Sequence, residues 1–212
     1  MTTVLLQTTY FGPVQWYQKL CRYDHCLIEQ YDSYQKQTYR NRCVIATANG
    51  LQALTVPVEH NVQRLTNDSQ QLTKDLRISD HNQWRRVHWN ALQSAYSESP
   101  FFEYYADDIR PFFEQRYDYL IDFNEAIRQK MCELIDIHPK VDYTTEYLST
   151  LNAQHSTQHD FREVIHAKHP LPDADFQPRP YWQVFQHRYG FQSNLSILDL
   201  LFCMGPESIF YL

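Results

Sequence analysis

The chain has 212 residues and a net charge of −6, and 43% of its residues are hydrophobic. This length and apolar content predict one folded domain, residues 1–212, and exclude a disordered chain. The acidic balance, without a basic tail or a long lysine–arginine run, excludes a general nucleic-acid partner, because such binding needs a positive surface.

The cysteines and the apolar runs indicate a cytoplasmic protein. The five cysteines are an odd number without a Cys-x-x-Cys pair, so neither a disulfide framework nor a zinc site is expected. Scattered thiols of this kind are typical of a reducing compartment. Residues 1–7 lack the cationic and apolar parts of a signal peptide. The run Leu195–Met204 is about half as long as a membrane span, so we expect no membrane insertion.

The first quarter of the chain predicts a strand, a turn, a helix and a second strand. Val4–Leu6 is a short apolar run, typical of a buried strand. Gly12 and Pro13 then form a bend, and proline suits the first turn of a helix. Apolar residues recur with helical spacing over 14–23, and Cys26–Ile28 is the second short strand.

A hairpin is predicted next. The polar segment 31–42 has neither helical nor strand periodicity and is interpreted as a loop or a short helix. The β-rich runs 43–47 and 51–58 flank Asn49-Gly50, the dipeptide that most strongly indicates a hairpin. Residues 59–74 are polar and predict a loop.

The remaining elements alternate strands with helices. They are a strand at 76–78, a helix over 81–97 capped by Asp80, helices over 109–114 and 117–135, a strand at 141–143, an irregular segment over 150–180, and a helix ending at Met204 that is capped by Ser193 or Asn194. This order predicts an α/β fold, with a mixed sheet, an Asn-Gly hairpin and helices packed on the sheet.

The glycines exclude the common phosphate-binding loops. Only four are present, and no two are spaced for a Gly-x-Gly-x-x-Gly fingerprint or a P-loop. We therefore expect no nucleotide cofactor, and a phosphate would have to be held by side chains or by a helix N-terminus.

The end of the first strand is the first candidate site. Gln7, Thr8, Thr9 and Tyr10 follow Leu6, and ligands of α/β sheets bind at the carboxyl ends of strands. The alternative is a polar turn whose side chains cap the following helix.

The segment 36–42 is the second candidate. Lys36, Arg40, Asn41 and Arg42 form the densest basic cluster of this acidic chain, and arginine forks bind phosphate or carboxylate with two hydrogen bonds. The alternative is a solvated loop paired with nearby acids such as Glu29 and Asp32.

Histidines and one buried acid complete the candidates. His155, His159, His166 and His169 lie in a segment without helical character, so a metal site is disfavoured. His88, between Trp84 and Trp89, is interpreted as packing at the core edge. Asp199 lies within an apolar helix, where pairing with an arginine is the favoured explanation.

Taken together, several segments resemble the bacterial WbqC-like family. The matching segments are 10–19, 36–42 leading into the hairpin and 54–58, 84–105, 181–185, 194–202 and 205–208. The resemblance covers nearly the whole chain and identifies residues 1–212 as a single WbqC-like domain. Members occur in surface-polysaccharide gene clusters, which implies transfer of a sugar or a sugar precursor.

The chain departs from the family pattern at two places. Many members begin with His-Gln-Pro, whereas this chain has Leu6-Gln7-Thr8, so a role for that histidine does not transfer. Many members carry an Asp-Asp pair where this chain has Gln30-Tyr31. The chain therefore resembles a divergent branch that keeps the basic cluster and lacks the histidine and the acidic pair.

Two hypotheses follow. In the first, the protein is a transferase-type enzyme acting on a nucleotide-activated sugar or a similar anionic metabolite. Its anion would be held by Lys36, Arg40 and Arg42 together with Asn41, and its acceptor would be oriented by Gln7 and Tyr10. The general base would be Glu29, Asp32 or His88. In the second, it is a non-catalytic binding or assembly protein with a protein partner.

Overall fold

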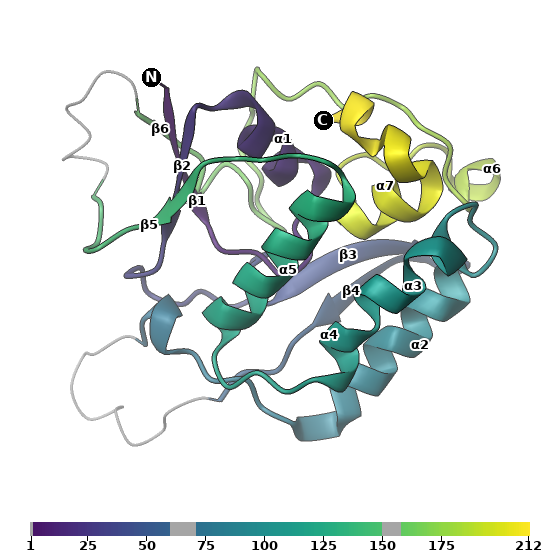
Figure 1. Ribbon diagram of the computed structural model, residues 1–212, viewed down its shortest axis with the longest axis horizontal. Coiled ribbons are helices and arrows are strands. Elements are labelled where there is room, and N and C mark those ends of the chain that lie inside the picture. Colours follow the sequence, from purple (N-terminus) through teal and green to yellow (C-terminus); the bar gives the residue numbers. More distant parts are fainter. Residues whose placement is uncertain (1, 60–70, 150–157) are drawn as a thin grey trace.

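The fold is built around a parallel sheet whose central strands are the first two predicted from the sequence (Figure 1). The computed structural model describes residues 2–59, 71–149 and 158–212. The strand order is β5-β2-β1-β6, with β1 Thr3–Gln7, β2 His25–Glu29, β5 Val141–Tyr143 and β6 Gln158–Asp160. All three strand pairs are parallel, so their carboxyl ends meet at one edge of the sheet.

The central strand is apolar on both faces, as its sequence predicts. Val4 and Leu6 are fully buried, and Leu5 on the opposite face is nearly so. A parallel strand covered on both faces needs a continuous apolar run, because neither face meets water. The register places Gln7 beside Glu29, so the last residues of β1 and β2 are neighbours.

The antiparallel pair forms a second, separate sheet. β3 Arg42–Thr47 and β4 Gly50–Thr55 pair along their whole length, with Thr47 opposite Gly50. Ala48 and Asn49 lie between the strands, and the left-handed backbone falls on Gly50, with φ at +103°. Glycine fits there because it has no Cβ.

The helices fill the space around the two sheets. In Figure 1, α2, α3 and α4 lie at the other end of the molecule from the parallel sheet. The helices are α1 Val14–Arg22, α2 Trp84–Tyr96, α3 Phe102–Ile109, α4 Pro111–Glu114, α5 Leu120–Leu134, α6 Gln186–Tyr189 and α7 Ile197–Met204. Among the described residues, short 3-10 helices cover Thr73–Asp75, His81–Gln83 and Gly205–Tyr211.

One continuous apolar cluster joins these elements. It includes Leu6 of β1, Ile45 of β3, Leu92 of α2, Ile127 of α5 and Leu200 of α7. The α/β class predicted from the alternation of strands and helices is confirmed, with the parallel and antiparallel strands in two sheets. Among the described residues, none of the helices combines the length and apolar character that crossing a bilayer requires.

Several predicted element boundaries are wrong. Residues 76–78 make isolated bridges and no strand, because Arg77 pairs with Tyr119 and Ile78 with Val58. The last helix begins after Ser196, whose hydroxyl accepts a hydrogen bond from the Leu198 amide, and not after Ser193 or Asn194. Asp80 does not cap α2; its carboxylate forms an ion pair with Arg85.

Two helices and one strand were missed in the sequence. α3 and α6 occupy residues that were left unassigned, and β6 lies within the segment predicted to be irregular. β6 has only three residues, Gln158, His159 and Asp160, and it is an edge strand without an apolar run. It places Asp160 at the carboxyl edge of the parallel sheet.

Candidate functional site

Polar side chains gather where the parallel strands end. Glu29 is the last residue of β2, Asp160 is the last residue of β6, and Thr144 directly follows β5. In open α/β sheets, ligands bind in the crevice outside this edge. We call the pocket at this edge the carboxyl-edge pocket.

Glu29 is fully buried and is held by four donors. Its Oε1 accepts hydrogen bonds from the Thr144 hydroxyl at 2.9 Å and from the Tyr31 amide at 2.8 Å. Its Oε2 accepts from the Leu148 amide at 3.1 Å and from Arg162 at 3.2 Å. A carboxylate only accepts hydrogen bonds, so four donors suit its ionised form. The residue joins β2, β5 and the chain after β6.

Arg162 links the ends of β2 and β6. Its Nη1 contacts Glu29, while its Nε and Nη2 donate to the two oxygens of Asp160 at 3.0 Å and 2.7 Å. Burial by itself would lower the pKa of Arg162, but its hydrogen bonds to Asp160 and the two nearby carboxylates raise that pKa above the ordinary value. The guanidinium therefore stays charged and fixes the position of both acids.

Asp32 and Arg40 form a second buried ion pair at the pocket. Arg40 Nη2 donates to Asp32 Oδ2, and the Thr73 hydroxyl donates to Asp32 Oδ1. The Arg40 carbonyl accepts from the Asn124 amide of α5 at 2.8 Å, which fixes the backbone of the loop. Two arginine–carboxylate pairs thus stand side by side in one pocket.

The carboxyl-edge pocket has a volume of about 480 Å³. Its lining residues are Tyr31, Asp32, Ser33, Gln35, Arg40, Tyr147, Asp160, Arg162 and Glu163. The volume is in the range of small-molecule sites. The Tyr147 ring lies over the Arg162 guanidinium, 5.4 Å from it, and just over half of Tyr147 is exposed. The lining therefore offers charged groups, hydroxyls and aromatic faces together.

The predicted basic cluster divides in the structure. Arg40 turns inward to Asp32, whereas the exposed Lys36 lies outside the pocket lining. Asn41 is buried and donates to the Val56 carbonyl at 2.8 Å, and Arg42 begins β3 and donates to Thr55. The cluster separates because the chain enters a strand at Arg42, which sends successive side chains to opposite faces.

The candidates at the end of β1 lie inside the core. The Gln7 side-chain amide donates to the Ile165 carbonyl at 2.6 Å. The Tyr10 hydroxyl lies 2.9 Å from His88 Nδ1, and both side chains are buried. Burial lowers the pKa of His88 to about 4, against a smaller opposite effect of a hydrogen bond with the Thr55 backbone. The imidazole is therefore neutral at physiological pH.

The described members of the histidine group each have other contacts. His155 lies outside the described residues, His159 packs against the Tyr23 ring, and His166 accepts from the amides of Lys168 and His169. Within residues 2–59, 71–149 and 158–212, no group of three or more His, Cys, Asp or Glu residues is arranged to hold a metal ion.

Asp199 is paired with tyrosines, and the expected pairing with an arginine is wrong. Its Oδ1 accepts from the Tyr96 hydroxyl at 2.8 Å, and its Oδ2 accepts from Tyr181 at 2.7 Å and from Gln183 at 2.9 Å. Burial raises the pKa of Asp199, and the three donors oppose that rise. Its partners join α2, the chain before α6, and α7, so its contacts are those of a structural residue.

Sequence reasoning missed Asp160, Arg162, Glu163 and Tyr147, which line the pocket. The available signal was the Asp160-Phe161-Arg162 run, which places opposite charges two residues apart around a buried aromatic residue. Charge patterns of this kind are common on surfaces, so only the strand before them reveals their place in the fold.

The chain belongs to the WbqC-like protein family, whose model matches residues 7–211. That match includes both ion pairs of the carboxyl-edge pocket. The uncharacterized protein Rv1507c of Mycobacterium tuberculosis is 27% identical over 236 aligned residues, which cover 98% of this chain and 96% of that protein. No solved structure matches the chain closely enough to compare folds.

Proposed function

We propose that the carboxyl-edge pocket binds the sugar of a nucleotide-activated sugar, or a similar anionic metabolite, and that the protein transfers a group to or from it. The observation that carries the proposal is the fixed pair of carboxylates, Asp32 and Asp160, each held by an arginine in one pocket. Carboxylates accept hydrogen bonds from sugar hydroxyls, and Arg40 and Arg162 suit a phosphate or a carboxylate.

The tyrosines and smaller polar residues support a hydroxyl-rich ligand. Tyr31 and Tyr147 offer aromatic faces, and Ser33 and Gln35 offer further donors and acceptors. A role in surface-polysaccharide biosynthesis, which the family resemblance implies, is part of the same proposal. Lys36, at the exposed end of the loop, would contribute long-range attraction for an anion.

Glu163 is the general base in this proposal, in place of Glu29, Asp32 or His88. Glu29 and His88 are buried, and both oxygens of Asp32 already accept hydrogen bonds. Asp160 is similarly occupied by Arg162. Glu163 is exposed at the pocket and makes no ion pair with another described residue. Its carboxylate takes the proton of the acceptor hydroxyl as that oxygen bonds to the donor carbon, and the leaving phosphate keeps the electron pair of the broken bond.

The test is thermal stability with a panel of nucleotide sugars, nucleotides and free sugars. A ligand at a hundred times its Kd adds about 2.7 kcal/mol, which corresponds to roughly 5–10 °C at this chain length. We expect Asp160→Asn to abolish the shift and Glu163→Gln to keep it while turnover is lost. The matched control is Asp107→Asn, which makes the same chemical change at an exposed position outside the pocket. No shift with any of these compounds, or an unchanged shift in Asp160→Asn, contradicts the proposal.

A non-catalytic assembly protein is the second candidate. Phe210 is 68% exposed and Tyr104 is 74% exposed, and large exposed aromatic side chains are typical of protein interfaces. In this case Phe210→Ser would abolish co-purification with a partner, whereas Asp160→Asn would not.

A further inference from the structure

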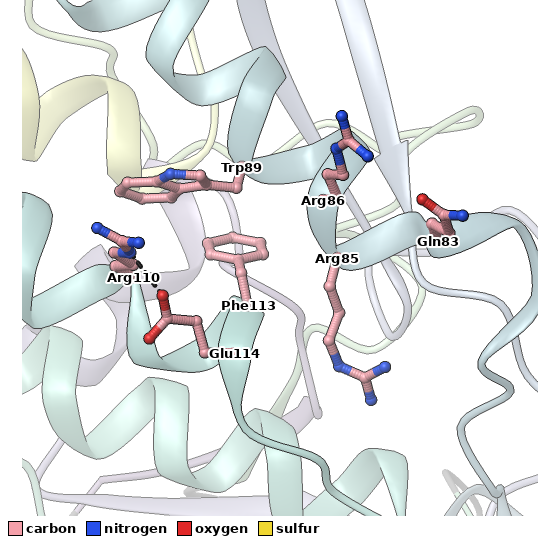
Figure 2. Close-up of a pocket in the computed structure, with 7 residues that line it drawn as sticks. All are labelled: Gln83, Arg85, Arg86, Trp89, Arg110, Phe113 and Glu114. Carbon is pink, nitrogen blue, oxygen red and sulfur yellow. Dashed lines mark hydrogen bonds and ion pairs between the residues drawn. The ribbon is translucent and has the colours of Figure 1, made fainter.

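A second pocket lies between α2 and α4, among residues that the carboxyl-edge pocket does not use. It has a volume of about 370 Å³ and is lined by Gln83, Arg85, Arg86, Trp89, Arg110, Phe113 and Glu114. We call it the arginine–aromatic pocket (Figure 2). In Figure 1 its helices lie at the other end of the molecule from the parallel sheet, so the two pockets are separate.

Two aromatic rings form the wall of this pocket. The Trp89 and Phe113 ring centres are 5.7 Å apart with a tilt of 39°. Trp89 is also packed against Phe102, and Phe113 is buried, so both rings are held from behind. Figure 2 shows the two rings between Arg110 and Glu114 on one side and Arg85 and Arg86 on the other. A planar ligand can therefore lie against a preformed aromatic surface.

The charged side chains of the pocket are mainly basic. Three arginines face one glutamate, in a chain whose net charge is −6. Arg110 Nε donates to Glu114 at 2.6 Å, and Arg85 pairs with Asp80 and lies over the Trp84 ring at 4.6 Å. Arg86 is exposed, and no carboxylate of the described residues forms an ion pair with it. Its guanidinium fork is free to bind an anion with two hydrogen bonds.

We propose that the arginine–aromatic pocket binds a small aromatic anion, a flat ring that carries a phosphate or a carboxylate. The ring lies on Trp89 and Phe113, and the anion is bound by Arg86, whereas Figure 2 shows the Arg85 side chain pointing away from that of Arg86. Nucleotides and aromatic acids share this chemistry. The inference does not depend on the function proposed for the carboxyl-edge pocket, because the two sites have no lining residue in common.

The first experiment is calorimetric titration of the full chain with 1-naphthyl phosphate, and with inorganic phosphate and 1-naphthol as half-ligands. We expect one saturable site for naphthyl phosphate, with a Kd at least tenfold lower than that of either half-ligand. Equal binding of naphthol and naphthyl phosphate would overturn the role of the arginines, and binding of inorganic phosphate as tight as that of naphthyl phosphate would overturn the role of the aromatic wall.

Variants locate the site. Arg86→Gln should weaken naphthyl phosphate binding at least tenfold, and Lys168→Gln, an exposed residue with the same change of charge, should leave it unchanged. Asp160→Asn should also leave it unchanged, which separates this site from the carboxyl-edge pocket. Trp89→Leu tests the aromatic wall, with its melting temperature as the folding control. Wild-type affinity in Arg86→Gln overturns the proposal.

The last comparison distinguishes the two sources of such a ligand. Uridine monophosphate and 2-naphthoate are titrated under the same conditions. Tighter binding of the nucleotide than of naphthyl phosphate supports the proposal with a nucleotide as the ligand, and tighter binding of naphthoate supports it with an aromatic carboxylate. If uridine monophosphate, 2-naphthoate and naphthyl phosphate all fail to bind, the proposal is overturned.

Discussion

Arg162 reaches across the end of the central strand to donate a hydrogen bond to Glu29, 133 residues away in sequence, at a distance of 3.2 Å. The Glu29 side chain is fully buried, and only 7% of the Arg162 side chain is exposed. The contact joins the first half of the chain to the segment after β6. Arg162 therefore both supports the parallel sheet through Glu29 and forms part of the wall of the carboxyl-edge pocket.

Removing Arg162 should therefore be costly for stability. Arg162→Ala leaves the buried Glu29 and the partly buried Asp160 without their shared cation. Losing one partner of a buried ion pair costs about 3–5 kcal/mol. Urea unfolding at pH 7 measures the change. Arg110→Ala is the control, because the Arg110–Glu114 pair is exposed and such pairs contribute about 0.3–0.5 kcal/mol. Equal losses in the two variants would contradict a structural role for the Glu29 contact.

His88 should make the protein less stable in mild acid. Burial lowers its pKa from the ordinary 6.5 to about 4, so between these values the unfolded chain binds a proton that the folded chain does not. Stability is then fully present above pH 6.5 and is lost as the pH falls toward 4. A tenfold change in proton affinity corresponds to about 1.4 kcal/mol, so the loss is roughly 3 kcal/mol.

The measurement is the free energy of unfolding as a function of pH for the wild type and for His88→Gln. The variant is expected to be less stable overall, because it loses the contact with Tyr10, but to lack this part of the pH dependence. The difference between the two curves gives the contribution of His88 to the pH dependence of stability, separated from that of the carboxylates that titrate in the same range. Parallel curves between pH 6.5 and 4 would show that His88 is accessible to protons in the folded state.

The sequence predicts the centre of the fold better than its edges. Val4–Leu6 is apolar on both faces of a covered strand, which leaves a clear signal in three residues. β6 has only three residues and lies at the edge of the sheet, and its Gln158-His159-Asp160 sequence carries no apolar signal. The strand exists because β1 offers it a parallel partner, and that is a property of the tertiary fold.

The dependence on the tertiary fold also explains which residues of the carboxyl-edge pocket the sequence predicts. Asp32 and Arg40 are eight residues apart, so one loop brings them together and the sequence suggests their pairing. Asp160 and Arg162 are brought to Glu29 only by β6, which the sequence does not reveal. Asp199 likewise takes its donor from Tyr96, 103 residues away, which no spacing predicts. Contacts between residues close in sequence can be predicted from the chain alone. Contacts between strands can be predicted only when the strand order is known.

The buried Asp199 should depend on its tyrosine donors. Tyr181→Phe removes one of the two hydrogen bonds at Oδ2 and leaves that from Gln183. Removing a partner from a buried polar group costs about 1–3 kcal/mol, so we expect a loss in this range, measured by urea unfolding at pH 7. Tyr189→Phe is the matched control, because its hydroxyl donates to the Ala48 carbonyl at an exposed position. A loss in Tyr181→Phe no larger than in the control would show that Asp199 does not need this donor.

The glycine after α7 should tolerate no side chain. Gly205 has a φ of +55°, and a Cβ there would lie 2.6 Å from the Phe101 ring. Left-handed backbone costs about 1–2 kcal/mol for other residues, and the overlap adds about 1–3 kcal/mol. Gly190→Ala is the control, because Gly190 has a φ of +70° and no atom within 4 Å of the added Cβ. We expect Gly205→Ala to lose clearly more stability than Gly190→Ala in urea unfolding.

The double variant Gly205→Ala with Phe101→Ala should lose less than the sum of its single changes, because the ring that causes the overlap is gone. Additive losses would mean that the backbone at Gly205, and not its contact with Phe101, sets the cost.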